Sequence, residues 1–239
     1  SVYLGSASGL STTPAWVATG DLNYDYFGQS VSTAGDVNGD GYSDVIVGAA
    51  GCAACTGGVA YVYLGSPSGL SAAPAWTAGG TNATQYFGTS VATAGDVNGD
   101  GYSDVVVGDP FYGGHAYVYL GSASGLSSAP AWSCQPFGSN AFGRSVATAG
   151  DVNGDGYSDV IVGDDQYRVS TTYPGAAYVF FGSPSGLSCT PGWSFVNDQD
   201  YSYFGYSVAS AGDVNGDGYA DVIVGAALYS NGEPNEGRA

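Results

Sequence analysis

The sequence predicts an all-β protein, a β-propeller built from four-stranded antiparallel blades. A motif that starts DVNGDGY recurs at Asp36, Asp96, Asp151 and Asp213, so successive copies begin 60, 55 and 62 residues apart. This period is longer than that of helical and short solenoid repeats and is close to the length of a propeller blade. Each copy also holds short apolar segments between Gly-rich breaks, and no window has a convincing helical period.

The first full repeat shows the expected strands in chain order. The segments SVSTAG (30–35) and DVIVGA (44–49) flank the Asp-rich loop as a hairpin. The alternating, aromatic VAYVYLG (59–65) is the third strand, and AWTAG (75–79) is the short fourth strand. Four antiparallel strands repeated radially let neighbouring blades bury each other's faces and leave only short edges.

The blade boundaries follow from the repeat. We expect one domain over residues 1–239, with blades at about 20–80, 81–134 and 135–197, and a fourth at 198–239 that is completed by residues 1–19 or by a neighbouring copy. The C-terminal GRA joined to the N-terminal SVYLGSASGLS matches GVAYVYLGSPSGLS in phase. Three arrangements stay open: a four-bladed ring closed by its own ends, head-to-tail pairing with another copy, or an excerpt from a longer repetitive chain. We favour continuation into further repeats or into a neighbouring copy.

Aromatic residues recur in register along the repeats. We expect them in the core between blades and not as stacking platforms for a ligand. They are Phe27, Phe87, Phe142 and Phe204, and Trp16, Trp76, Trp132 and Trp193.

The net charge of −18 comes from 21 acidic residues against three arginines. It excludes nucleic acid and anionic membrane surfaces as partners, because both need clustered cations. Three Asp in each of the four motifs account for 12 of the 21 acidic residues, so we interpret the acidity as mostly metal-ligand charge. There is no apolar run near 18 residues, no initiator Met and no signal peptide, so we expect no membrane insertion and a mature or excised piece.

Four cysteines are present. Cys52 and Cys55 form a C-x-x-C, which we interpret as a short-loop disulfide in an oxidising compartment, since a single pair without a nearby His is weak for zinc. Cys134 and Cys189 lie close to the recurring tryptophans of successive repeats, which allows a bridge between blades.

The Asp-rich loop has the spacing of a calcium site. Calcium prefers six to eight oxygen ligands, and a nine-residue loop supplies them from side chains at positions 1, 3, 5 and 9 and the carbonyl at 7. In the first loop these are Asp36, Asn38, Asp40, Asp44 and the backbone of Tyr42. Val stands at position 12, where an EF-hand carries Glu, so the expected site is a strand-loop-strand hairpin.

A Phe-Gly pair precedes each loop, at 27–28, 87–88, 142–143 and 204–205, and GAA, GDP or GDD comes after each loop, at Gly48, Gly108, Gly163 and Gly225. The chain therefore resembles the FG-GAP repeats of the integrin α-subunit β-propeller and of many bacterial extracellular proteins. The resemblance implies one structural Ca²⁺ in each of four loops and an extracellular or cell-surface location. The family propeller usually has seven blades, and four repeats are present here. The ligands implied for the later loops are Asp96, Asn98, Asp100, Tyr102 and Asp104; Asp151, Asn153, Asp155, Tyr157 and Asp159; and Asp213, Asn215, Asp217, Tyr219 and Asp221.

We weighed three functions. The first is a non-catalytic calcium-binding module for adhesion, surface display or self-assembly, whose partners are other copies or further repeats head to tail, or an extracellular protein or glycan. Binding would fall to the variable segments 51–58, 164–176 and 197–205. The second is a lectin-like propeller that binds carbohydrate between blades. The third, a hydrolase, is disfavoured by the single His, the absence of Lys and the lack of a G-x-S-x-G motif.

Overall fold

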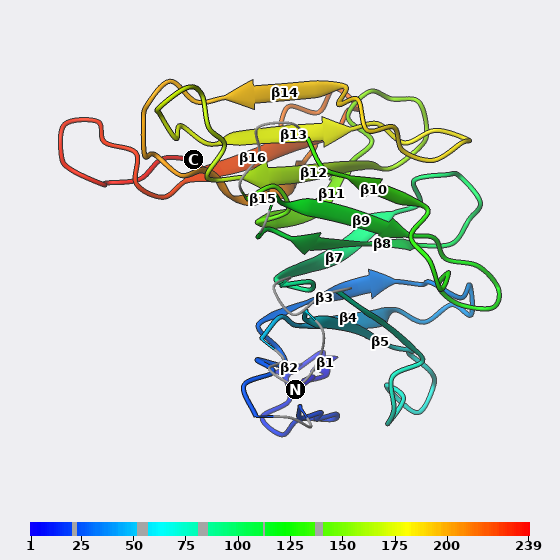
Figure 1. Ribbon diagram of the computed structural model, residues 1–239. Coiled ribbons are helices and arrows are strands. Elements are labelled where there is room, and N and C mark those ends of the chain that lie inside the picture. The colour runs from blue at the N-terminus through cyan, green and yellow to red at the C-terminus, as the bar shows by residue number, and fades with distance from the viewer. Residues whose placement is uncertain (21–22, 52–56, 81–85, 112, 137–140) are drawn as a thin grey trace.

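The computed structural model describes residues 1–20, 23–51, 57–80, 86–111, 113–136 and 141–239 (Figure 1). Every named element in these ranges is a β-strand, and none of the described residues forms a helix that could cross a membrane. The first sheet has the order β3-β4-β5-β6 and is antiparallel throughout. Its strands are β3 (Ser30–Gly35), β4 (Asp44–Ala49), β5 (Val59–Tyr63) and β6 (Trp76–Gly79).

Two further four-stranded sheets repeat this topology. One contains β7 (Ser90–Gly95), β8 (Asp104–Asp109), β9 (His115–Tyr119) and β10 (Trp132–Cys134). The other contains β11 (Ser145–Gly150), β12 (Asp159–Asp164), β13 (Ala176–Phe180) and β14 (Trp193–Val196). Two-stranded sheets stand at the two ends of the chain: β1 (Gly5–Ser6) with β2 (Gly9–Leu10), and β15 (Phe204–Gly212) with β16 (Asp221–Ala226).

The sheets stack as propeller blades through their first strands. Strand β3 packs beside β7, β7 beside β11, and β11 beside β15. Figure 1 shows the resulting row, with the N-terminus at one end and the C-terminus beside β16 at the other. The all-β propeller-blade prediction is confirmed by three four-stranded antiparallel sheets. Among the described residues, β1–β2 and β15–β16 form separate two-stranded sheets that do not pair with each other.

Apolar clusters fill the spaces between blades. At the first interface, between β3–β6 and β7–β10, Ala34, Val37 and Ile46 pack against Phe87 and Val91. At the second interface, between β7–β10 and β11–β14, the corresponding residues are Ala94, Val97 and Val106 against Phe142 and Val146. Each cluster thus draws alternate residues from two blades, as period-two strands buried on both faces require.

Glycines explain how closely the blades approach. A Cβ at Gly48 would overlap the carbonyl oxygen of Gly88, and the same holds for Gly108 against Gly143. Gly88 and Gly143 follow the recurring Phe and have φ of 86° and 88°, a backbone conformation that favours glycine. The two glycines of each repeat are therefore contact points between neighbouring backbones.

The recurring aromatics mostly lie where the sequence indicates. Phe87 and Phe142 are buried, and Trp76 and Trp132 pack edge-on against Tyr119 and Phe180. Trp193 is a correction, because its side chain is exposed. The reason is structural: the β15–β16 sheet beside it has no outer strands to cover β14.

The outer strands are fastened to the next blade in two ways. Trp76 Nε1 donates a hydrogen bond to the Ser127 carbonyl oxygen (2.9 Å) across the first interface. At the second interface, a disulfide joins Cys134 to Cys189. The bridge between blades that the sequence allows is therefore present, while Cys52 and Cys55 lie outside the described residues.

Candidate metal-binding loops

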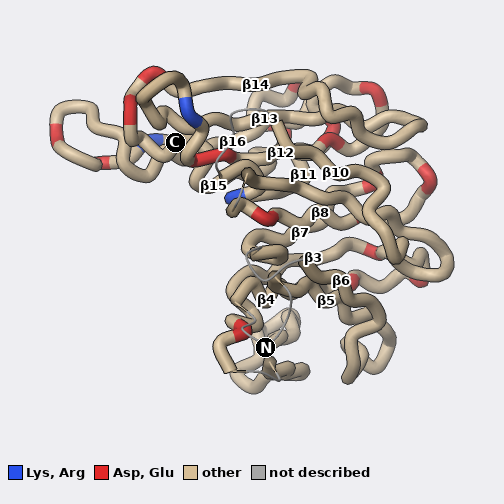
Figure 2. The backbone as a smooth tube through the Cα atoms, in the orientation of Figure 1, with Lys and Arg blue, Asp and Glu red and all other residues tan. Residues whose placement is uncertain are grey.

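The four Asp-rich loops connect the first and second strands of each sheet. They begin where β3, β7, β11 and β15 end, after a register shift that places Gly35 opposite Asp44 and its counterparts likewise. All four therefore lie on the same rim of the blades, and Figure 2 shows acidic positions along it. The connection from the third to the fourth strand, which contains Gly65 in the first blade, reaches the same rim.

The carboxylate of the first Asp in each loop accepts hydrogen bonds from the backbone of that loop. Asp36 Oδ1 accepts hydrogen bonds from the N–H groups of Gly39 (2.8 Å) and Asp40 (3.1 Å), and Oδ2 accepts one from Gly41 (2.8 Å). Gly39 and Gly41 have φ of 72° and 88°. The same three bonds recur from Asp96, Asp151 and Asp213. The glycines at positions 4 and 6 thus allow the backbone to curl around one carboxylate.

The third and fifth positions contact each other. Asn38 Nδ2 donates to Asp40 Oδ2 (3.0 Å), and Asp40 Oδ1 accepts the N–H of Tyr42 (3.0 Å). Asn38 Oδ1 accepts the N–H of Asp40 (3.2 Å). Both side chains therefore remain at the loop, where their oxygens are accessible to solvent on exposed or half-buried residues.

The ninth position ties the loop to the blade. Asp44 is fully buried, and its two oxygens accept the N–H groups of Val37 (2.8 Å) and Gly65 (2.8 Å). Burial raises the pKa of Asp44, and the nearby Asp40 and Asp36 carboxylates raise it further. In the second loop the same causes raise the pKa of Asp104 to about 7. The three carboxylates of a loop thus lie near enough to repel one another.

The donor set fits a hard cation. Each loop offers three carboxylates, one amide oxygen and one backbone carbonyl, all oxygen donors of the kind that calcium takes. A carboxylate oxygen that accepts one backbone N–H keeps a further lone pair, and a cation would offset the repulsion among the three acids. In the described ranges, however, no three or more His, Cys, Asp or Glu side chains are already gathered around one point as a metal site.

Neighbouring loops are linked, which the sequence reasoning missed. The Ser103 N–H donates to the Asp36 carbonyl oxygen (2.9 Å), and Ser103 Oγ accepts the Asp36 N–H (3.1 Å). The next pair repeats this with Ser158 and Asp96. The available signal was the Tyr-Ser that follows GDG in three of the motifs and is Tyr-Ala in the fourth, where only the backbone bond from Ala220 remains.

Comparison with known proteins agrees with the repeat pattern. The family described as "FG-GAP-like repeat" matches residues 36–107 and 96–162, and the "FG-GAP repeat" matches residues 204–239. Integrin alpha-5 of Xenopus laevis is 31% identical over 219 residues, which cover 84% of this chain and 20% of that protein. Integrin alpha-V of Gallus gallus is 33% identical over 239 residues, covering 91% and 21%. The chain therefore spans about a fifth of the length of these relatives.

A solved structure shows a similar fold at low sequence identity. The crystal structure of the Saccharomyces cerevisiae Sqt1 aligns with a TM-score of 0.50 and 13% identity, covering 84% of this chain and 43% of that one. At this identity the likeness concerns the fold alone.

Proposed function

Because the chain belongs to the FG-GAP repeat family, we propose that it is a non-catalytic extracellular β-propeller module for adhesion, surface display or self-assembly, stabilised by calcium in its loops. The observation that carries this proposal is the loop described above, built the same way four times around a first-position Asp. A turn with only a structural role does not require three carboxylates that repel one another.

The proposed ligands are the residues at positions 1, 3, 5, 7 and 9 of each loop. In the first loop Asp36, Asn38, Asp40 and Asp44 would hold Ca²⁺ with their side chains, and Tyr42 with its carbonyl. A bound cation supplies positive charge among the three acids. The protein's own part is to hold the hairpin and, through Ser103 and its counterparts, the next loop in place.

The proposed location outside the cell rests on the disulfide and on the relatives. Disulfides persist in oxidising compartments and are rare in the reducing cytosol, and Cys134–Cys189 fastens two blades together. The curated relatives are integrin alpha subunits. We propose no catalytic role, because the carboxylates of the four loops are engaged with the backbone of the same hairpins.

The proposed surface for a protein or glycan ligand is the opposite rim, where the repeats differ. Tyr173 and Tyr201 stack there with ring centroids 5.7 Å apart, and Arg168 lies over the Tyr173 ring at 5.7 Å. Both Tyr201 and Tyr203 have positive φ, at 55°. Positive φ strains the backbone of a non-glycine residue, and backbone strain of this kind is concentrated at functional sites.

Calcium removal tests the proposal. We expect titration calorimetry to give four Ca²⁺ per chain, and excess chelator to lower the melting temperature. At free Ca²⁺ one hundred times its dissociation constant, each independent site adds about 2.7 kcal/mol to the free energy of unfolding. Asp40→Ala should reduce the stoichiometry by one, because damage in repeat proteins stays near the mutated unit. A melting curve that chelator leaves unchanged would show that the metal proposal is wrong.

A further inference from the structure

Each Asp-rich loop is bonded to the next loop along the chain at residues that flank its proposed ligands. Ser103 Oγ accepts the Asp36 N–H (3.1 Å), and the Ser103 N–H donates to the Asp36 carbonyl oxygen (2.9 Å). Asp36 is the first position of one loop, and Ser103 lies between the seventh and ninth positions of the next, Tyr102 and Asp104. We refer to these two hydrogen bonds, which join the start of one ligand set to the end of another, as a link.

A second path joins the same two loops. The Ser122 N–H donates to the Val37 carbonyl oxygen (3.1 Å), one residue after the first-position Asp. The residue before it, Gly121, donates its own N–H to Asp104 Oδ1 (2.8 Å) in the next loop. A movement of Val37 therefore displaces the backbone that positions the buried Asp104 carboxylate.

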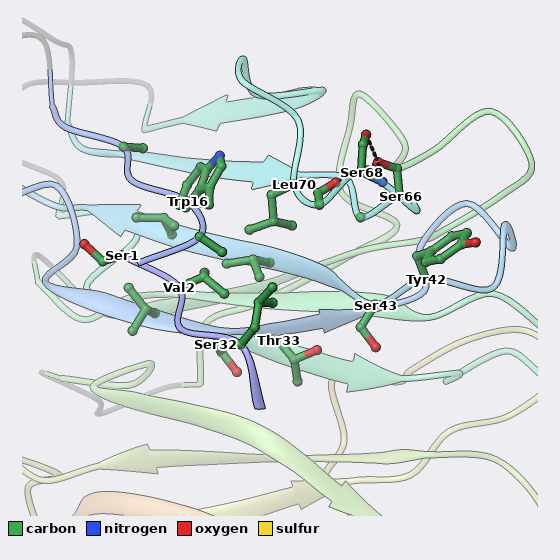
Figure 3. Close-up of a pocket in the computed structure, with 18 of the residues that line it drawn as sticks. Ser1, Val2, Trp16, Ser32, Thr33, Tyr42, Ser43, Ser66, Ser68 and Leu70 are labelled. Carbon is green, nitrogen blue, oxygen red and sulfur yellow. Dashed lines mark hydrogen bonds between the residues drawn. The ribbon is translucent and has the colours of Figure 1, made fainter. Parts of the chain in front are cut away.

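Aromatic rings add a third contact between the loops. The Tyr102 ring lies on Gly39, where an added Cβ would come within 2.7 Å of it, and Gly39 stands between the third- and fifth-position ligands. Figure 3 shows the same Tyr-Ser pair in the first loop, where the side chains of Tyr42 and Ser43 project from the hairpin and line a groove. The Tyr42 N–H stays bonded to Asp40 Oδ1. The pair thus extends its side chains out of its own loop while its backbone remains part of it.

The link is complete at two pairs of loops and reduced at the third. Ser158 makes the same two hydrogen bonds to Asp96, at 3.2 and 2.9 Å. The third pair has the bond from the Ala220 N–H to the Asp151 carbonyl oxygen (2.9 Å), and alanine has no hydroxyl to accept the second. The chain therefore contains an internal comparison between links with and without the serine hydroxyl.

We propose that the links couple calcium binding at neighbouring loops, so that an ion bound at one loop raises the affinity of the next. The inference rests on the calcium part of the proposed function and adds the regulation of those sites. An ion at the first loop restrains Asp36, and the link passes that restraint to Ser103, between the ligands Tyr102 and Asp104 of the second loop. The second loop then loses less conformational freedom when it binds its own ion, which is positive cooperativity.

Charge acts in the opposite direction, so the sign of the coupling identifies its cause. Each loop carries three Asp, and a bound divalent ion offsets most of their negative charge. Electrostatics alone therefore predicts that a filled loop attracts calcium less strongly to its neighbour, and salt screens this effect. An affinity that rises when the neighbouring loop is filled reports the contacts between the loops and not their charges.

The sixth-position glycines give a separate signal for each site. The Gly41 and Gly101 N–H groups each donate to the first Asp carboxylate of their own loop (2.8 Å), so their NMR signals should shift when that carboxylate binds calcium. Calcium titration of the isotope-labelled, chelator-treated chain then gives a dissociation constant for each loop. Asp40→Ala empties the first loop and should weaken calcium binding at the second, read from Gly101, by about fivefold.

Substitutions at the links change no charge and provide the matched comparison. In a Ser103→Ala background, Asp40→Ala should weaken the second loop by only about twofold, because one of the hydrogen bonds that carry the coupling is gone. Ala220→Ser is the reverse change, since it adds a hydroxyl to the third link. It should increase the effect that emptying the third loop with Asp155→Ala has on the fourth loop, read from Gly218.

The controls separate this inference from its premise. Ser133→Ala, on the exposed side of β10, should leave the coupling unchanged, and Asp100→Ala should weaken the first loop because coupling is reciprocal. Unchanged or tighter binding at the second loop after Asp40→Ala would overturn the inference, as would coupling that Ser103→Ala does not reduce. If calcium shifts none of the glycine signals, the proposed calcium binding is itself wrong. If calcium binds every loop with an affinity that ignores its neighbours, only the coupling is wrong.

Discussion

The first and second interfaces pack alike in their cores and differ at their outer edges. Both bury a phenylalanine and small aliphatic residues between blades, and both link successive loops through a serine. At the outer edge, the first interface has the hydrogen bond from Trp76 to Ser127, whereas Trp132 Nε1 has no partner among the described residues and a disulfide stands nearby.

This difference shows which part of a blade the repeat determines. The backbones of neighbouring blades touch at Gly48 and Gly88, and at Gly108 and Gly143. These contacts fix the position of each blade's inner strands against the next blade. The outer strands are farther from these contacts, so a covalent bond can replace a tryptophan hydrogen bond without changing the stacking. Repeats that match residue for residue in the core therefore need not have equal stability at their edges.

The largest expected effect comes from removing the disulfide. The double substitution Cys134→Ala with Cys189→Ala should lower the free energy of unfolding by about 2–4 kcal/mol, because the bridge closes a long loop of the unfolded chain. Urea denaturation would measure it, and the other two cysteines stay in place. An unchanged midpoint would mean that the disulfide adds nothing measurable to the stability of the second interface.

A buried acid at the end of β8 gives the next effect. Burial raises the pKa of Asp109 to about 6 from 3.8, although its Oδ1 accepts the Tyr86 N–H (2.9 Å). Between pH 4 and 6 the folded state holds a proton that the unfolded state releases, so stability falls as pH rises through this window. Asp109→Asn should make stability nearly independent of pH in this window. At pH 7 it should raise the free energy of unfolding by about 1 kcal/mol, because removing the buried charge gains about 3 kcal/mol and the unpaired amide offsets most of that gain.

Melting temperatures across the pH range would measure the effect of Asp109→Asn. Asp198→Asn serves as the matched control, because Asp198 is exposed and its replacement should leave the profile unchanged. Asp164, the last residue of β12, holds the corresponding place in the next blade and accepts the Ala141 N–H (3.1 Å). If Asp109→Asn destabilises the protein at neutral pH, the buried charge is compensated and this reasoning is wrong.

The smallest effect separates the two tryptophans. Trp76→Phe and Trp132→Phe remove similar ring area from similar sites, but only the first breaks a hydrogen bond across the interface. Trp76→Phe should therefore cost about 1 kcal/mol more than Trp132→Phe in chemical denaturation. Equal losses would show that the bond to Ser127 contributes nothing net, and that the two edges differ through the disulfide alone.

Much of the fold could be predicted from the sequence, because strands in a repeat protein are short and locally marked. The alternation in residues 59–63 and the glycines around each loop place β3, β4 and β5 without any long-range information. The loops could also be placed, since Asp36, Gly39 and Gly41 interact within five residues of one another. That the same Asp residues bind calcium remains a prediction.

The contacts between repeats could not be predicted in the same way. The sequence left the pairing of Cys134 with Cys189 open, because whether residues 55 apart meet depends on how one blade is turned against the next. It placed Trp193 in the core by analogy with its counterparts, although the analogy fails where the neighbouring sheet has two strands. The bond from Gly65 to Asp44 joins positions 21 residues apart, which no local pattern marks.

The disulfide also has a mechanical consequence if the chain carries load, as the proposed adhesion role would require. A pulling force that opened the second interface could lengthen the chain only outside the segment between Cys134 and Cys189, whose sequence separation is 55. Fully stretched, a segment of that size would span about 190 Å at roughly 3.4 Å per residue. Because the disulfide joins the two ends of this segment, the segment cannot extend under force. The outer edges of the two blades would therefore stay close together if the interface opened, and the interface could form again when the force is removed.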